Sequence, residues 1–76
     1  MEICFKIAQT YKNCYDFKKS TVYLENALEI AVKLNDRYNE MIALDKIGMC
    51  YFYKGNTTAA YYYHSNILTL ENINSR

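Results

Sequence analysis

Cysteine and histidine are the residue types in this chain that could build a metal site. Cys4, Cys14, Cys50 and His64 supply the thiolate and imidazole donors that tetrahedral zinc prefers. Their spacing argues against such a site, because two positions ten apart on one helix lie about 80° apart around it and about three turns apart along it. Cys4 and Cys14 therefore cannot chelate one ion from the same helix. We expect no metal and no cofactor, mainly buried, unreactive thiols, and an interior histidine.

A second candidate for chemistry is the row of three tyrosines at Tyr61, Tyr62 and Tyr63. Aromatic rings stack on the bases of single-stranded nucleic acids. Successive helical positions point about 100° apart, however, so three adjacent rings cannot form one continuous platform, and one or two of them should be core. The net charge is only +1 and the charges are interspersed. Without a basic face, we expect no nucleic-acid partner.

Catalytic machinery is not evident in the sequence. No nucleophile with a base and an orienting group, no glycine-rich phosphate loop and no paired-acid motif can be assembled from it, so we expect a protein that is not an enzyme. The three cysteines are odd in number and widely spaced, which favours a reducing, intracellular and cytoplasmic location over a disulfide framework. Glu2 interrupts any basic leader and no apolar run approaches about 18 residues, so we expect no membrane partner.

Apolar periodicity predicts four amphipathic helices that must position these side chains. The first covers roughly residues 1 to 14. Asp16 and Asp36 can cap the second and third, Gly55 can end the third, and Asn56 or Thr57 can cap the fourth. Positions expected on the buried stripes are Ile3, Ile7, Ala8 and Tyr11, then Val22, Tyr23, Ala27, Ile30, Ala31 and Leu34, then Met41, Ala43, Leu44, Ile47, Gly48, Tyr51 and Phe52, then Ala60, Tyr63, His64, Ile67, Leu68 and Ile73.

The chain also echoes itself forty residues apart. Met1, Lys6, Ile7, Tyr11, Tyr23, Asn26 and Leu28 recur as Met41, Lys46, Ile47, Tyr51, Tyr63, Asn66 and Leu68. Such an echo is typical of stacked supersecondary units that cannot each bury an apolar face alone. We interpret residues 1–36 and 37–76 as two repeats of a single domain. Because arrays usually need about three repeats, we expect this domain to be a segment of a longer array. Gly48 costs helix stability, which predicts close approach by a neighbouring helix.

The second unit carries a family resemblance in Leu44, Ile47, Gly48, Tyr51, Gly55 and Ala60, and the first unit matches it in Ile7, Ala8, Tyr11, Ser20, Leu24 and Ala27. This pattern resembles the tetratricopeptide repeat, in a variant longer than the usual period of about 34 residues. His64, Ile67, Val32 and Asn72 depart from it. The resemblance implies an all-α fold of two antiparallel helix-turn-helix hairpins in a right-handed α-solenoid. The implied repeat core is Ile7, Ala8, Tyr11, Ala27, Leu44, Ile47, Gly48, Tyr51 and Ala60.

In that family the first helix of each repeat lines a concave groove. The corresponding positions here are Glu2, Phe5, Gln9 and Lys12, then Ile42, Asp45, Met49 and Phe52. The carboxylate clamp that grips chaperone tails needs lysine and asparagine four residues apart, and the matching pairs here are Phe5 with Gln9 and Asp45 with Met49. Chaperone-tail binding is therefore disfavoured. An apolar or helical partner protein fits the groove positions Phe5, Ile42, Met49 and Phe52 better, and further repeats of the same chain could cover them instead.

The resemblance implies a non-catalytic scaffold for protein–protein interaction. Two alternatives stay open on the sequence. One is a regulator whose groove binds a short peptide and shifts the helical array between packings. The other is an architectural component of a large assembly, cytoskeletal or ciliary, in which a fixed neighbour fills the groove.

Overall fold

The protein is entirely helical over the part of the chain described by the computed structural model, residues 1–74, with side chains described for residues 1–69. The helices are α1 (Glu2–Asn13), α2 (Phe17–Lys33), α3 (Arg37–Tyr53) and α4 (Thr57–Asn74), and these residues contain no strand. The prediction of four helices and an all-α fold is confirmed. The expected burial of Ile73 lies outside the described side chains.

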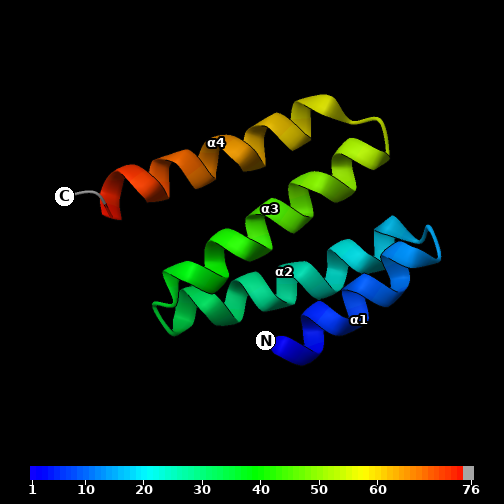
Figure 1. The fold of residues 1–76 in the computed structure, drawn as a ribbon, viewed down its shortest axis with the longest axis horizontal. Coiled ribbons are helices and arrows are strands. Elements are labelled where there is room, and N and C mark those ends of the chain that lie inside the picture. Colours follow the sequence, from blue (N-terminus) through cyan, green and yellow to red (C-terminus); the bar gives the residue numbers. More distant parts are fainter. Residues whose placement is uncertain (75–76) are drawn as a thin grey trace.

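The four helices form a zigzag array (Figure 1). Each helix packs against the next one along the chain, α1 on α2, α2 on α3 and α3 on α4. The Cα trace extends over 40 × 27 × 13 Å, so the array is about a third as thick as it is long. Figure 1 shows α1 and α4 at opposite edges of the array. These two outer helices each have one closely packed neighbouring helix, and α2 and α3 each have two.

Each helix after the first begins with the same side-chain cap. Oδ1 of Asp16, Asp36 and Asn56 accepts a hydrogen bond from the backbone N–H three residues later, at 3.2, 3.1 and 3.1 Å. This bond satisfies one of the N–H groups that a helix start leaves without a partner. The predicted caps are thus present, with Asn56 rather than Thr57 in the third turn. At Asp36 the Asn39 side chain adds a second bond of 2.6 Å, and together these bonds lower the pKa of the Asp36 carboxyl.

Each of the first three helices also ends in the same way. Tyr15, Asn35 and Gly55 have left-handed backbone, with φ of 62°, 54° and 86°. The N–H of the following residue then donates to the carbonyl five residues earlier, at 2.8 to 2.9 Å. This is the Schellman arrangement of helix C-termini. The three turns follow one another at intervals of twenty residues, so the forty-residue echo divides into helix-turn units of half that length. In the sequence this finer period is visible at the caps Asp16, Asp36 and Asn56 but not at the left-handed residue, which differs in type at each turn.

Burial follows the predicted stripes in α3 and departs from them in α2. The buried side chains are Ala8, Ser20, Thr21, Leu24, Ala27, Ala31, Ala43, Leu44, Ile47, Cys50 and Ala60, together with Gly48. Val22, Ile30 and Leu34, predicted to be buried, are exposed, as are Ile3, Phe52 and Leu68. Ile7, Tyr11 and Tyr51 of the predicted repeat core are half-buried.

The error in α2 has a specific cause, which is that two hydroxyl residues belong to the core. Ser20 Oγ donates to the Ala8 carbonyl at 2.8 Å, and Thr21 Oγ1 donates to the Phe17 carbonyl at 2.8 Å. A hydroxyl whose hydrogen bond is made inside the protein can be buried at little cost. Apolarity alone therefore centred the predicted α2 stripe too far toward Val22 and Ile30, although Ala27 and Ala31 of that stripe are buried.

None of the helices in the described part of the chain is both long enough and apolar enough to cross a membrane.

Candidate functional site: a groove between α1 and α3

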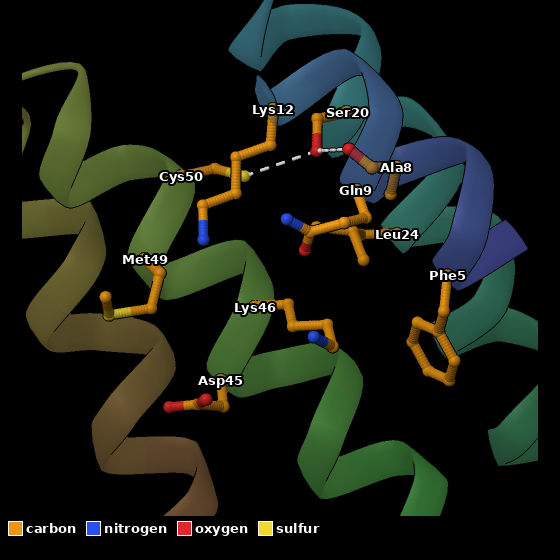
Figure 2. A pocket seen from close by; sticks show the side chains of 10 residues that line it. All are labelled: Phe5, Ala8, Gln9, Lys12, Ser20, Leu24, Asp45, Lys46, Met49 and Cys50. Carbon is orange, nitrogen blue, oxygen red and sulfur yellow. Dashed lines mark hydrogen bonds between the residues drawn. The ribbon is translucent and has the colours of Figure 1, made fainter. Parts of the chain in front are cut away.

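A cavity of about 220 Å³ lies between α1 and α3, with α2 beneath it. Figure 2 shows the side chains that line it, converging from the three helices. The lining residues are Phe5, Ala8, Gln9 and Lys12 from α1, Ser20 and Leu24 from α2, and Asp45, Lys46, Met49 and Cys50 from α3.

A short chain of hydrogen bonds fixes the floor of the groove. Cys50 Sγ donates to Ser20 Oγ at 3.5 Å, and Ser20 Oγ donates to the Ala8 carbonyl at 2.8 Å. These three residues come one from each helix, so the chain links α3 to α2 and α2 to α1 (Figure 2). Ser20, Cys50 and Leu24 are each about 1% exposed. The polar atoms of the floor are therefore committed within the protein, and Leu24 gives the floor an apolar surface.

The rim of the groove carries mixed charge. Lys12 and Lys46 bring two ammonium groups, and Asp45 brings one carboxylate. Asp45 Oδ1 also lies 3.4 Å from His64 Nε2 on α4, and the Lys12 ammonium lies 5.2 Å from the centre of the Tyr53 ring. With two cations to one anion, the rim favours a partner that presents acidic groups.

Most of the predicted groove residues meet at this cavity. Phe5, Gln9, Lys12, Asp45 and Met49 all line it. Ile42 and Phe52 do not line it: Ile42 is half-buried elsewhere on α3, and Phe52 is 56% exposed, its ring 5.9 Å from that of Tyr53. Glu2 is also outside the groove, 3.6 Å from Lys6 in an exposed ion pair.

Sequence reasoning missed half of the lining. Lys46 was recognised only as part of the echo, although it lies one helical turn before Met49 and so on a neighbouring part of the same face. Ala8 was assigned to the core alone, and the contributions of Ser20, Leu24 and Cys50 depend on how α2 is rotated beneath the groove. The helical spacing of α3 was a usable signal for Lys46, whereas the α2 residues needed the structure.

The cysteines and the histidine do not form a common site. Cys50 is buried, Cys4 is half-buried and Cys14 is exposed, so the expectation of buried thiols is wrong for Cys14, which follows the last residue of α1. All three are free thiols. Within the described residues, no three histidine, cysteine, aspartate or glutamate side chains gather closely enough to hold a metal ion.

His64 is not the interior histidine that was expected, because its side chain is 44% exposed. It stands directly over Gly48: a Cβ added to that glycine would lie 3.1 Å from His64 Nε2 and 3.5 Å from the Ala60 carbonyl oxygen. The missing side chain at Gly48 thus leaves room for the imidazole ring to lie across α3 and reach Asp45.

Of the three adjacent tyrosines, only Tyr63 packs inward. Its ring stacks on Tyr51, with centroids 5.5 Å apart and planes at 9°, and removal from water raises the pKa of the Tyr63 hydroxyl. Tyr61 and Tyr62 are 77% and 62% exposed. They point in different directions from the helix, so they form no joint stacking surface.

No family model matches the chain, and comparisons with curated proteins and with solved structures give no significant match.

Proposed function

We propose that this chain is a non-catalytic protein-interaction scaffold of the tetratricopeptide type, in which the groove between α1 and α3 receives an apolar side chain of a partner helix. In this proposal the two helix pairs are consecutive hairpins of a right-handed α-solenoid. The observation that carries the proposal is the groove itself, an open hollow built by three helices, in which apolar side chains such as Phe5, Leu24 and Met49 alternate with polar and charged ones.

The size of the groove supports a peptide anchor over a small-molecule ligand. Pockets for drug-sized ligands and cofactors have volumes of roughly 300 to 1,000 Å³. A cavity of about 220 Å³ is smaller than that range and suits one large apolar side chain, or two small ones. Partner helices bind such grooves through anchors that recur at every third or fourth residue.

The walls and the rim indicate the chemistry of the partner. Phe5 and Met49 offer an aromatic ring and a flexible thioether, which adapt well to leucine or methionine anchors. Lys12 and Lys46 would attract glutamate or aspartate beside those anchors. The expected partner is therefore an amphipathic helix with acidic flanks. The free thiols of all three cysteines support an intracellular location for this interaction.

The test uses a labelled amphipathic peptide with leucine anchors flanked by glutamate, and a matched peptide with lysine in place of glutamate. We expect saturable binding of the glutamate peptide, with amide NMR shifts at the groove residues and binding weaker by about tenfold or more for the lysine peptide. Phe5→Ala should weaken binding by about fivefold or more, because it removes an anchor contact. Phe52→Ala, which removes an exposed aromatic ring outside the groove, is the matched control and should bind as the unmodified chain does.

The proposal is wrong if the glutamate peptide shifts no groove amide, or if Phe5→Ala and Phe52→Ala affect binding equally.

A further inference from the structure

The outer helices α4 and α1 each have an exposed face. The equivalent faces of α2 and α3, forty residues away in the sequence, are buried. Leu68 on α4 is 61% exposed, and Tyr61 is 77% exposed. Their counterparts forty residues earlier are Leu28, which packs against the core, and Thr21, which is 6% exposed. On the other edge, Ile3 of α1 is 72% exposed, whereas its counterpart Ala43 on α3 is fully buried.

The contact between α2 and α3 explains these differences. Its antiparallel register is given by the Phe17 ring against Tyr53, with centroids 5.7 Å apart, and by Cys50 Sγ on Ser20 Oγ. Leu24 and Ile47 continue the same contact in the core cluster. One further step of about four residues along each helix brings Leu28 opposite Ala43. The buried faces of α2 and α3 are thus two halves of one joint between repeats.

The exposed face of α4 is equivalent to the buried face of α2, and the exposed face of α1 is equivalent to the buried face of α3, each forty residues away in the sequence. The face of α4 equivalent to that of α2 carries Thr57, Ala60, Tyr61, His64 and Leu68, and the face of α1 equivalent to that of α3 carries Ile3, Lys6, Ile7, Thr10 and Asn13. We infer that α4 of one copy of this chain docks on α1 of a second copy in the register of the α2–α3 contact, so that copies stack head to tail.

That register gives the individual contacts of the joint. Ile3 would meet Leu68 and Ile7 would meet His64, in place of Ala43 with Leu28 and Ile47 with Leu24. Thr10 would lie over Ala60, which is already buried against α3 in the single copy, in place of Cys50 over Ser20. Ile3 and Leu68 form its apolar end, and both have most of their side-chain surface exposed in the single copy.

Two polar residues of the joint, Thr10 and His64, have partners inside their own copy. Thr10 Oγ1 donates to the Lys6 carbonyl at 3.1 Å, as Thr21 does to the Phe17 carbonyl within the buried α2 face. His64 Nε2 faces Asp45 of the same chain at 3.4 Å. Docking therefore does not leave these two groups buried without a hydrogen-bonding partner.

This stacking is separate from the proposed groove function. Phe5, Gln9 and Lys12 lie on a different side of α1 from Ile3 and Thr10, so the groove stays open in the stack. The joint uses a different surface on each copy, which makes it heterologous. Unless its rotation closes a ring, such a contact produces an open series of oligomers and not a closed dimer.

The test is sedimentation velocity of the 76-residue chain over a range of concentrations, without any peptide. We expect a weight-average mass that rises with concentration and passes that of a dimer. Ile3→Glu should block the α1 half and Leu68→Glu the α4 half, so each variant alone should be monomeric. Val22→Glu is the matched control, because it places the same charge at an exposed apolar position on the outer side of α2, and it should assemble as the unmodified chain does.

A mixture of the two blocked variants gives the sharpest result. Ile3→Glu keeps an intact α4 face and Leu68→Glu keeps an intact α1 face, so an equal mixture should form dimers and nothing larger. Thr10→Arg and Tyr61→Arg repeat the experiment at a second position on each face, and circular dichroism checks that every variant is helical.

A chain that stays monomeric at all concentrations overturns the inference and leaves the α4 face to a further helix of a longer chain or to another protein. Assembly that Ile3→Glu and Leu68→Glu do not reduce, or a mixture that stays monomeric, overturns it as well.

Discussion

The helix pair α1–α2 and the helix pair α3–α4 have the same backbone arrangement and the same tyrosine stack. They differ in the residue types at other equivalent positions. Both pairs stack two tyrosines, Tyr11 on Tyr23 at 5.7 Å and Tyr51 on Tyr63 at 5.5 Å, with planes at 14° and 9°. The positions beside these stacks differ. Where the first pair has Phe5 and Leu24, the second has Asp45 and His64.

That difference follows from the place of each helix in the array. Leu24 belongs to α2, which has a neighbour on both sides, and it is 1% exposed. His64 belongs to α4, at the edge, and its side chain is 44% exposed. A position that is enclosed favours an apolar side chain, whereas the same position at an edge tolerates an imidazole that reaches a carboxylate through water-accessible space. Equivalent positions in the two helix pairs thus have the same backbone conformation, but their side chains can differ in polarity.

The largest effect is expected from truncation at Leu24. Leu24→Ala should lower the free energy of unfolding by about 2 to 5 kcal/mol, because it leaves a cavity where three helices meet. A core of this size rarely supplies more than about 3 to 5 kcal/mol, so the variant should be largely unfolded even without denaturant. Circular dichroism and a chemical denaturation curve measure this loss.

His64→Ala is the matched change in the second pair, and we expect it to cost less than about 1 kcal/mol, since its contact with Asp45 is exposed. Equal losses at the two positions would contradict the distinction between an enclosed and an edge position.

A smaller effect is expected at Gly48, the counterpart of Ala8. Gly48→Leu should cost about 1 to 3 kcal/mol, because a Cβ there already lies 3.1 Å from His64 Nε2 and a leucine would also press on the Ala60 carbonyl. Gly48→Ala should cost much less, since the imidazole ring can rotate away and alanine favours the helix. The double change Gly48→Leu with His64→Ala should recover part of the loss. Thermal melts that show no loss for Gly48→Leu would mean that α4 does not approach α3 at this point.

The helices and their caps could be predicted from the sequence because both depend on local chemistry. Asp16 and Asp36 cap helices with their own oxygens, and Gly55 takes a left-handed backbone that few residues accept. The rotation of α2 could not be predicted in this way. It depends on Ser20 finding the Ala8 carbonyl on another helix, a contact that apolar periodicity does not record.

The same limit applies to the groove. Phe5, Gln9, Lys12, Asp45 and Met49 follow from helical spacing within α1 and α3, and all five line the cavity. Ile42 and Phe52 have similar spacing but lie outside it, because the groove covers only the middle of α3. Where a groove begins and ends along a helix is set by how two helices approach each other, which spacing within one helix does not determine.

The smallest effect, and the only gain, is expected at the turns. Tyr15 and Gly55 occupy the same left-handed position, forty residues apart, with φ of 62° and 86°. A bulky residue is strained in this conformation and glycine is not, at a cost of about 1 to 2 kcal/mol. Tyr15→Gly should therefore stabilise the protein by about 1 kcal/mol, reduced by the stabilisation that the contact of Tyr15 with Phe17 contributes. Gly55→Ala should destabilise the protein by a similar amount.

A change of that size shifts the melting temperature by roughly 4 to 8 °C in a domain of this length. No atom lies within 4 Å of a Cβ built on Gly55, so the loss at that position would report backbone strain and not crowding. If Tyr15→Gly lowered the melting temperature instead, the edge contact of the Tyr15 ring with Phe17, at 6.3 Å, would outweigh the strain, and the two turns would differ in energy although they share a backbone.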